Sequence, residues 1–187
     1  MIQLKEDIKN GKWTLFLDRD GVINHRPIND YVRKKDDFKF INGVLDSLSL
    51  LKSLFSPIVV VTNQQGVAKG LMSMKDVDEI HQFMIKEIEN NGGKIDAVYT
   101  ASQMKSEKGY FRKPGVGMGA KAKRQFPEIC FSKSVMIGDT MSDMLFAKRL
   151  KMKSVYIGTA EDYDKERWYL VDYRFLDLKD FTKYITQ

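Results

Sequence analysis

Two aspartates, Asp18 and Asp20, stand at the end of an apolar run and are followed directly by Gly21. The run itself, residues 13–17, is rich in strand-forming residue types. A strand that delivers paired carboxylates to its carboxyl end, before a glycine that lets the chain turn, builds a reactive loop. One carboxylate of such a pair can attack as a nucleophile while its neighbour serves as general acid and base. Taken alone, the same residues also fit a polar turn, because Asp and Gly are common turn residues.

Two further polar segments carry groups suited to holding a phosphoryl oxygen. Thr62, Asn63 and Gln64 follow a second apolar run and offer a hydroxyl and amide donors. Arg112 and Lys113 follow a third run, and the proline after them fixes the backbone before the next helix. Positioning and charge neutralisation by such groups are most of what phosphoryl transfer requires.

A fourth apolar run is followed by a second pair of carboxylates, Asp139 and Asp143. If these approach Asp18 and Asp20, their mutual repulsion requires a cation or a proton. A hard divalent ion with oxygen ligands, Mg²⁺ above all, meets that requirement. The chain has no Gly-x-x-x-x-Gly-Lys-Ser/Thr motif, which excludes a P-loop nucleotide enzyme.

These candidate residues all follow segments that the apolar pattern predicts to be strands. Continuously apolar runs, typical of parallel strands covered on both faces, predict strands at 14–17, 58–61, 97–100, 134–137, 154–157 and 173–176. Apolar residues at helical spacing predict helices at 44–54, 74–88 and 117–125, and another after Asp139. Ser73 is the expected N-cap of the second helix, and Gly92 follows its end. The alternation predicts a doubly wound parallel sheet in three α/β/α layers, with ligands at the carboxyl ends of the strands.

The overall composition suits a single domain over residues 1–187, with 43% hydrophobic residues to supply its core. No run approaches the roughly 20 apolar residues of a membrane span, and the first residues are too charged for a signal peptide. We therefore expect a cytoplasmic monomer without a membrane partner. Cys130, the sole cysteine, has apolar neighbours and is expected to pack against them.

The net charge of +6 would attract phosphorylated substrates or nucleic acid. Its short basic clusters are interpreted as solvated helix surfaces, since no recognisable nucleic-acid motif accompanies them. A nucleic acid is therefore not the expected partner.

The ordered motifs resemble those of the haloacid dehalogenase superfamily of phosphatases. That signature is Asp-x-Asp-Gly, a Thr or Ser after the second strand, a Lys, and a terminal Asp pair, and all four elements occur in order between Asp18 and Asp143. Within the superfamily, residues 17–24, 62–70 and 112–115 are most similar to the group of D,D-heptose 1,7-bisphosphate phosphatases and histidinol-phosphatases.

The resemblance implies a role for each central residue. Asp18 attacks phosphorus and forms an aspartyl-phosphate, and Asp20 protonates the leaving oxygen and then activates water. Because an ordinary Asp has a pKa of about 3.9, we expect the pKa of Asp20 to be raised. Asp18, the backbone carbonyl of Asp20 and Asp139 coordinate Mg²⁺, while Thr62 and Lys113 grip the phosphoryl oxygens.

The resemblance leaves other residues with alternatives. Asp143 either assists the metal, orients Lys113, or is a helix N-terminal carboxylate favoured by the dipole. Arg112 either meets a second phosphate of the substrate or is a surface residue. Asn63 and Gln64 are expected to bind substrate, and His25 either lines the substrate entrance or is not involved.

One departure from the group concerns zinc. The group commonly carries a loop of Cys and His ligands before the Arg-Lys-Pro motif, but residues 100–111 contain neither. A structural zinc site needs four ligands, and the whole chain holds only Cys130, His25 and His81. We therefore expect no structural zinc, and His81, within an amphipathic helix, is interpreted as a structural or surface residue.

Cap domains of this superfamily are inserted after the first motif or after the third strand. Residues 22–43 and 101–111 leave room only for loops or a small flap, so a capless, open site is expected. Tyr110 and Phe111 are expected to hold the second loop by packing.

We therefore expect a Mg²⁺-dependent phosphatase that acts on a small phosphorylated metabolite through an aspartyl-phosphate. Residues 23–24, 30–32 and 38–44 look more like the heptose branch, which favours D-glycero-D-manno-heptose 1,7-bisphosphate as substrate. Histidinol phosphate is the alternative substrate. A polynucleotide 3′-phosphatase, a nucleic-acid-binding module and a catalytically silent binding protein are the alternatives from other classes.

Overall fold

A six-stranded sheet forms the centre of the molecule, with strand order β3-β2-β1-β4-β5-β6 and every neighbouring pair parallel. The computed structural model describes residues 2–27, 30–107, 109–159 and 165–187. Its strands are β1 (Trp13–Leu17), β2 (Phe55–Asn63), β3 (Ala97–Ala101), β4 (Ser134–Gly138), β5 (Lys153–Ile157) and β6 (Tyr173–Phe175). The chain adds β2 and β3 on one side of β1 and then returns to place β4 on the other side. This reversal beside β1 is where ligands bind in sheets of this kind.

Apolar residues on both faces of the central strands explain why helices cover the sheet twice. Leu15 and Leu17 of β1 belong to one core cluster, whereas Phe16 between them belongs to the other. Successive side chains of a strand point to opposite faces, so an uninterrupted apolar strand must be covered on both. The doubly wound α/β sheet expected from the sequence is confirmed.

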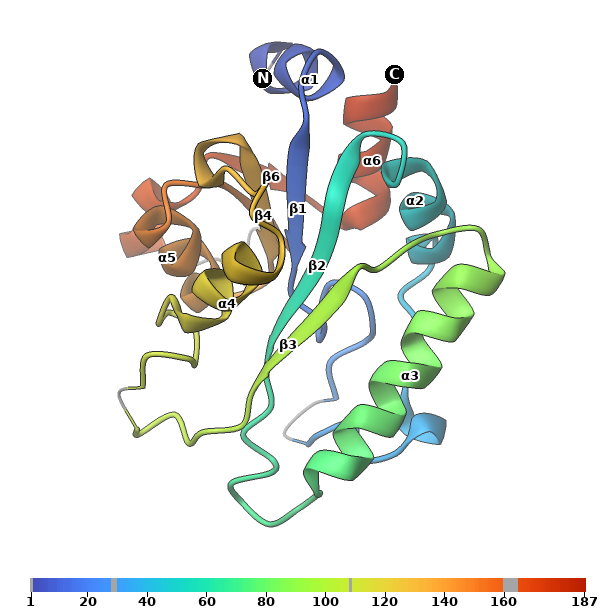
Figure 1. Cartoon of the computed structure of the whole chain (residues 1–187), viewed down its shortest axis with the longest axis vertical. Helices are drawn as coiled ribbons and strands as arrows, with labels where there is room; N and C mark the ends of the chain where they lie inside the picture. The colour runs from blue at the N-terminus through green and yellow to red at the C-terminus, as the bar shows by residue number, and fades with distance from the viewer. Residues whose placement is uncertain (1, 28–29, 108, 160–164) are drawn as a thin grey trace.

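The helices divide between the two faces. Figure 1 shows α4 (Gly117–Gln125) and α5 (Met141–Arg149) on one side of the sheet, with α2 (Val44–Leu51), α3 (Met74–Asn90) and α6 (Leu178–Thr186) on the other. The core clusters divide in the same way, since buried residues of α2, α3 and α6 share one cluster and those of α4 and α5 contribute to the other.

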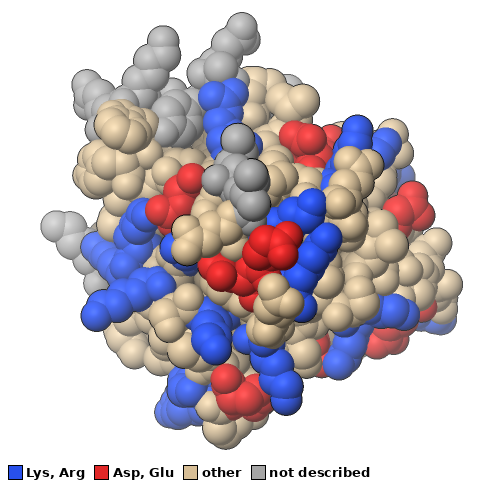
Figure 2. All heavy atoms as spheres, turned by 90° about the horizontal axis from the view of Figure 1, so that it is seen from above, with Lys and Arg blue, Asp and Glu red and all other residues tan. Residues whose placement is uncertain are grey.

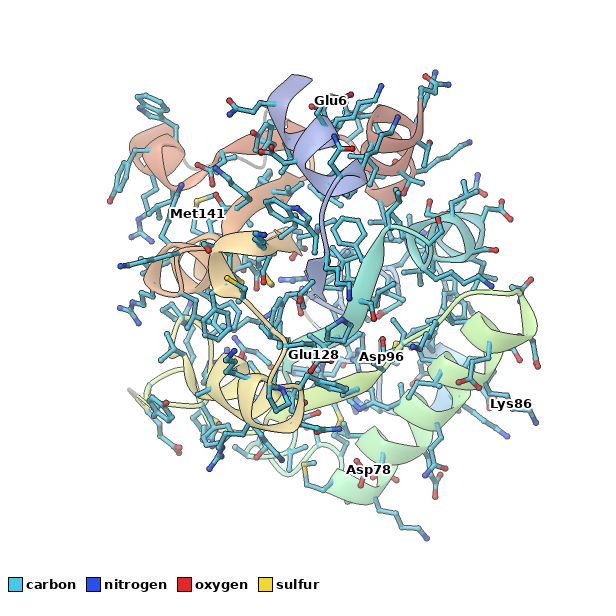
Figure 3. All side chains as sticks on the ribbon, turned by 45° about the horizontal axis from the view of Figure 1, so that its top comes forward. Glu6, Asp78, Lys86, Asp96, Glu128 and Met141 are labelled. Carbon is cyan, nitrogen blue, oxygen red and sulfur yellow. The ribbon has the colours of Figure 1, made fainter. Side chains whose placement is uncertain are left out.

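The longest helix, α3, shows how sequence sets an element. Ser73 caps its start in a capping box with Asp76, as expected, and Gly92 follows its end at φ +77°. Its buried residues recur at helical spacing, while Asp78 and Lys86 project from the opposite, exposed side (Figure 3).

Two helices were not anticipated from the sequence, α1 (Ile2–Lys9) and α6. Leu4 and Ile8 of α1 and Phe181 and Ile185 of α6 are buried in the same core cluster. The two helices lie next to each other at the amino ends of the strands (Figure 1). They extend the apolar cover of the sheet at the end away from the candidate residues.

The expected packing of Cys130 is wrong, because its side chain is exposed. Its neighbour Ile129 takes the buried position. Cys130 itself has an extended backbone just before a short 3-10 helix, η2 (Phe131–Lys133), so adjacent side chains point in opposite directions. Its Sγ lies 3.2 Å from Ser132 Oγ at the surface.

The two segments where a cap could be inserted contain little regular structure. Between β1 and α2 the described residues form one short 3-10 helix, η1 (Lys35–Asp37). Between β3 and α4 none of the residues that can be described lies in a helix or strand. In that second loop Phe111 packs against the core, but Tyr110 is 61% exposed and contacts the Phe111 ring edge-on at 5.9 Å between centroids. The expectation of packing therefore holds for Phe111 alone.

None of the helices described is both long and apolar enough to cross a lipid bilayer.

Candidate active site

The candidate residues converge where β1, β2 and β4 end. Leu17, the last residue of β1, pairs with Val60 of β2 and Ile137 of β4. The backbone N–H of Asp18 continues the β4 ladder by donating to the Ile137 carbonyl oxygen at 2.9 Å. Asp18 thus starts its loop directly beside Asp139, which follows β4.

Lys113 reaches this point from the loop after β3 and is only 2% exposed. Its Nζ lies 2.9 Å from Asp18 Oδ1 and 2.6 Å from Asp143 Oδ1, and it donates to the Val61 carbonyl oxygen at 2.6 Å. Burial would lower the pKa of Lys113, but the carboxylates of Asp143 and Asp18 outweigh it and raise that pKa. Lys113 is therefore a fixed buried cation beside the proposed nucleophile.

Asp143 is fully buried, and its two carboxylate oxygens contact different partners. Oδ1 faces Lys113, whereas Oδ2 accepts hydrogen bonds from Thr140 N at 3.1 Å and Thr140 Oγ1 at 2.6 Å, which caps α5. Two of the alternatives for this residue are thus combined in its contacts: it orients Lys113 and closes the first turn of a helix.

A cluster of carboxylates lies beside this lysine. Ligand atoms of Asp18, Asp139 and Asp143 all lie within 4.8 Å of one another. Burial and the neighbouring carboxylates Asp143 and Asp20 raise the pKa of Asp18 to about 6 despite the opposing charge of Lys113. Burial and Asp18 raise the pKa of Asp139 to about 8. The pKa values of both groups are therefore higher than those of ordinary aspartates. A hard cation bound between them would favour the ionised carboxylates and lower both pKa values.

Arg26 is a site residue that no motif in the sequence indicates. Its Nη2 lies 2.7 Å from Asp139 Oδ1 and 3.8 Å from Asp18 Oδ2, and it donates to the backbone carbonyl oxygen of Asp20 at 3.0 Å. These three oxygens, one each from Asp18, Asp20 and Asp139, converge on a single positively charged nitrogen. They are the same groups that the family resemblance assigns to a metal, so the donor set fits a divalent cation.

The carboxylate of Asp20 takes part in a separate network. It accepts from Arg19 Nη2 at 2.9 and 3.0 Å, from Asn24 Nδ2 at 2.9 Å and from Gln64 Nε2 at 2.7 Å. Burial alone would raise the pKa of Asp20, but the Arg19 charge and the donated hydrogen bonds outweigh it and lower that pKa. The expectation of a raised pKa is therefore wrong for the protein without ligands. The reason is the donor set, because Arg19 and the two amides all favour the ionised form.

The same glutamine connects this network to Thr62. Gln64 Nε2 also donates to Thr62 Oγ1 at 2.8 Å, and both residues are buried. Gln64 thus lies between the acid–base candidate and the hydroxyl expected to hold a phosphoryl oxygen.

Gly21 makes the close approach of the two loops feasible. Its backbone has φ +89°, and a Cβ at this position would lie 1.9 Å from Asp139 Oδ2. Any side chain at residue 21 would displace Asp139 from the carboxylate cluster.

The remaining predicted residues differ in position. Asn63 receives a hydrogen bond from Lys113 N at 3.0 Å and donates to the Lys113 carbonyl oxygen at 3.1 Å, so its amide holds the lysine loop. Arg112 lines the cleft described below, where its Nη1 donates to the Gln103 carbonyl oxygen at 3.2 Å. His25 is exposed and is not among the residues that line that cleft.

A cleft of about 1050 Å³ opens above Asp18 and Asp20. Met141, which lies at the start of α5 (Figure 3), lines this cleft. The basic side chains of the wall are Arg26, Lys69, Lys105, Arg112, Lys113, Arg149 and Arg167. Tyr31 adds an aromatic surface, with Lys69 Nζ 5.3 Å from its ring centroid and Gln65 donating to its hydroxyl at 2.9 Å. The cleft therefore suits a small, multiply anionic ligand.

The chain is similar in sequence to a known family of phosphatases. Residues 15–175 match the family model described as "Polynucleotide kinase 3 phosphatase". The D-glycero-alpha-D-manno-heptose-1,7-bisphosphate 7-phosphatase of Mycobacterium bovis is 39% identical over 136 residues, which cover 73% of this chain and 72% of that protein. The D-glycero-beta-D-manno-heptose-1,7-bisphosphate 7-phosphatase of Helicobacter pylori is 34% identical over 146 residues, covering 78% and 83%.

Among solved structures, the D,D-heptose 1,7-bisphosphate phosphatase of B. bronchiseptica, complexed with magnesium and phosphate, superposes with a TM-score of 0.79. The match is 23% identical and covers 92% of this chain and 97% of that one. At this identity the likeness shows a shared fold.

Proposed function

Because the chain belongs to the haloacid dehalogenase phosphatases, in the group of D,D-heptose 1,7-bisphosphate phosphatases, we propose that it removes the 7-phosphate of D-glycero-D-manno-heptose 1,7-bisphosphate. The observation that carries this proposal is the position of Asp18. Its carboxylate lies beside a buried lysine at the floor of a cleft whose wall is rich in Lys and Arg. One phosphate of a bisphosphate would meet Asp18, and the other would meet the basic wall.

The contacts of Asp18 and Asp20 support the following proposed reaction. Asp18 Oδ1 accepts from Arg19 N at 2.7 Å and faces Lys113, which together fix the carboxylate. An oxygen of Asp18 forms a bond to phosphorus while the bond from phosphorus to the sugar oxygen breaks, and Asp20 delivers a proton to that oxygen. Water then attacks the aspartyl-phosphate and gives a proton to Asp20, which releases inorganic phosphate and restores Asp18.

The proposed cofactor is Mg²⁺, held by the carboxylates of Asp18 and Asp139 and the backbone carbonyl of Asp20. When bound, it would neutralise negative charge between the nucleophile and the phosphate. Asp143 is proposed to act on this site through Lys113, since its Oδ1 is 2.6 Å from Nζ. Thr62 is proposed to donate its hydroxyl hydrogen to a phosphoryl oxygen, because Gln64 already occupies a lone pair of that hydroxyl.

Arg112 is the proposed contact of the second phosphate. It is partly buried in the cleft wall and adjoins Lys113 in sequence, which sets it just beyond the reaction centre. A guanidinium can bind a phosphate through two parallel hydrogen bonds. His25, which is exposed and outside the cleft wall, has no role in this proposal.

A panel of substrates tests the assignment. Phosphate release would be compared for the α and β anomers of the heptose bisphosphate, histidinol phosphate and a 3′-phosphorylated oligonucleotide. The two anomers are included because the relatives named above differ in this respect. The proposal requires the highest kcat/KM for a heptose bisphosphate, and equal or better turnover of histidinol phosphate would contradict it.

The second candidate is a polynucleotide 3′-phosphatase, which the description of the matching family model favours. A protein that grips a DNA backbone gathers basic residues into a stripe. In the cleft, the basic residues are accompanied by Asp30 and Glu107. The opposite face, at the amino ends of the strands, carries intermingled basic and acidic side chains (Figure 2). Preferential turnover of the oligonucleotide, with an affinity that falls steeply with salt, would select this candidate instead.

A further inference from the structure

We propose that His81 of α3 is a positioning residue for the reaction, which acts on the carboxylate of Asp20 through the buried side chain of Arg19. The inference rests on the proposed phosphatase chemistry in one respect, the use of Asp20 as acid and base. It adds a residue that contacts this network through Arg19, and that sequence alone presents as a structural or surface histidine.

Arg19 is the intermediate contact of this arrangement. The residue is 1% exposed, although it lies between two aspartates at the head of the reactive loop. Its Nη2 contacts both carboxylate oxygens of Asp20, at 2.9 and 3.0 Å, and its Nη1 lies 3.2 Å from His81 Nε2. The guanidinium is thus held at its two terminal nitrogens, one toward the reaction site and one toward α3.

The chemistry of arginine decides the state of His81. A guanidinium has five N–H donors and no acceptor, so Nε2 of His81 must accept, and the ring proton must lie on Nδ1. Burial and the Arg19 charge lower the pKa of His81 to about 3, which agrees with a neutral ring. His81 therefore offers a fixed lone pair and no charge to Arg19.

Removal of that lone pair would free the guanidinium. Among the residues that the structure describes, none makes a hydrogen bond with Arg19 Nε. Without His81, Arg19 would have a buried, unsatisfied Nη1 donor, which is costly, and only Asp20 would fix its orientation. The guanidinium of Arg19 would then reorient to find another acceptor for Nη1, and the carboxylate of Asp20 would move with it.

His81 is a polar residue on an otherwise apolar, buried face of α3. His81 is 6% exposed and lies on the buried face of α3, with Val77, Ile80 and Met84. An apolar side chain would suit that face without any polar partner. The buried imidazole is matched instead by one specific partner, which is the residue that grips the acid–base carboxylate.

The test exploits the chemistry of the leaving group. An alkyl leaving group needs a proton from Asp20, whereas p-nitrophenolate leaves readily without one. His81→Leu, which removes the acceptor, is expected to slow the first turnover of a sugar phosphate by about tenfold or more, which is part of the roughly 10²–10⁴-fold that general acid catalysis contributes. The first turnover of p-nitrophenyl phosphate is expected to change by less than about threefold. The sugar phosphate is any one that the unaltered protein hydrolyses, so the comparison is independent of the natural substrate.

Two variants separate positioning from folding. His81→Gln restores an acceptor near Nε2 and is expected to recover most of the sugar-phosphate rate. Met84→Ala removes a buried side chain from the same helix face and is expected to lower thermal stability while affecting both substrates equally. The inference would be overturned if His81→Leu slowed both substrates alike, if it slowed neither, or if His81→Gln were no better than His81→Leu.

Turnover of sugar phosphates but not of the heptose bisphosphate would contradict the proposed substrate and leave the inference about His81 intact.

Discussion

Asp18 and Asp20 are separated by one residue, yet their carboxyl groups lie in opposite electrostatic environments. Burial and neighbouring carboxylates raise the pKa of Asp18 to about 6, whereas the Arg19 charge and amide donors overcome burial to lower the pKa of Asp20. Asp18 is therefore mostly ionised at neutral pH, and a bound cation would favour its ionised, nucleophilic form further. Asp20 needs a nearby anion to become an acid, and a bound phosphate would raise its pKa in that way.

Arg26 gives a direct test of the carboxylate cluster as a cation site. Its Nη2 contacts the three oxygens proposed to bind Mg²⁺, so the metal must displace the guanidinium. Arg26→Ala is expected to tighten Mg²⁺ binding about fivefold, which corresponds to the roughly 1 kcal/mol of a partly exposed ion pair. Isothermal titration calorimetry of the metal-free protein would measure it.

The matched control for Arg26 is Arg149→Ala. Arg149 also lines the cleft, but its Nη1 donates to the Pro114 carbonyl oxygen and not to the carboxylates. Its removal is expected to leave Mg²⁺ affinity unchanged. Weaker Mg²⁺ binding by Arg26→Ala would show that Arg26 orders the cluster and does not compete with the metal.

Several site residues could be predicted from the sequence and others could not, for a physical reason. Asp18, Thr62 and Asp139 each follow an apolar run, and parallel strands bring their carboxyl ends together. Arg26 and His81 carry no such signal, because their contacts depend on the path of a loop and on the docking of a helix. The lowered pKa of Asp20 was missed for the same reason, since its donors converge only in the folded chain.

Among the elements, the tight loop after β1 contributes most to the site. Gly21 has φ +89°, and an added Cβ would lie 1.9 Å from Asp139 Oδ2. Gly21→Ala is therefore expected to abolish measurable Mg²⁺ binding and phosphatase activity. The positive φ should also reduce the free energy of unfolding by about 1–2 kcal/mol, as urea denaturation would measure.

Gly70→Ala separates the two effects. Gly70 also has a positive φ, +69°, but an added Cβ would meet no atom within 4 Å. This variant is expected to lose a similar amount of stability and to keep its metal affinity and activity. If Gly21→Ala also kept its metal affinity and activity, the close approach of Gly21 to Asp139 would not be needed for function.

The elements differ in how readily they could be predicted. The strands and the helices α2 to α5 could be predicted because apolar runs and periodicity mark them, with boundary differences such as the longer β2, Phe55–Asn63. The terminal helices α1 and α6 were missed. Their buried residues, such as Leu4 and Phe181, are few and become informative only once both helices pack on the same core.

The whole molecule couples metal binding to pH. In the metal-free protein the pKa values of Asp18 and Asp139 are raised to about 6 and about 8 from a usual 3.8. Between the usual and raised values the folded state binds more protons than the unfolded state. These two groups therefore make the free energy of unfolding fall as pH rises from about 4 to about 8.

Mg²⁺ and protons compete for the same carboxylates, so added Mg²⁺ is expected to raise Tm more at pH 8 than at pH 6. Thermal unfolding with and without a fixed excess of Mg²⁺ would measure both shifts. Asp139→Asn removes a proposed ligand and is expected to reduce the Mg²⁺-induced rise in Tm at both pH values. Equal shifts at both pH values in the unaltered protein would contradict the competition.

The expected absence of structural zinc stays a prediction. Zinc content would be measured on the purified protein by elemental analysis, and a stoichiometric amount would contradict it.

The central claim is that Asp18 is the nucleophile, and the most direct measurement is to trap its phosphorylated form. The protein would be mixed with excess Mg²⁺ and p-nitrophenyl phosphate, quenched with acid within one turnover, digested and examined by mass spectrometry. The account predicts a phosphoryl group on Asp18 in the unaltered protein, and neither label nor turnover in Asp18→Asn. Turnover by Asp18→Asn, or a label on any other residue, would contradict it.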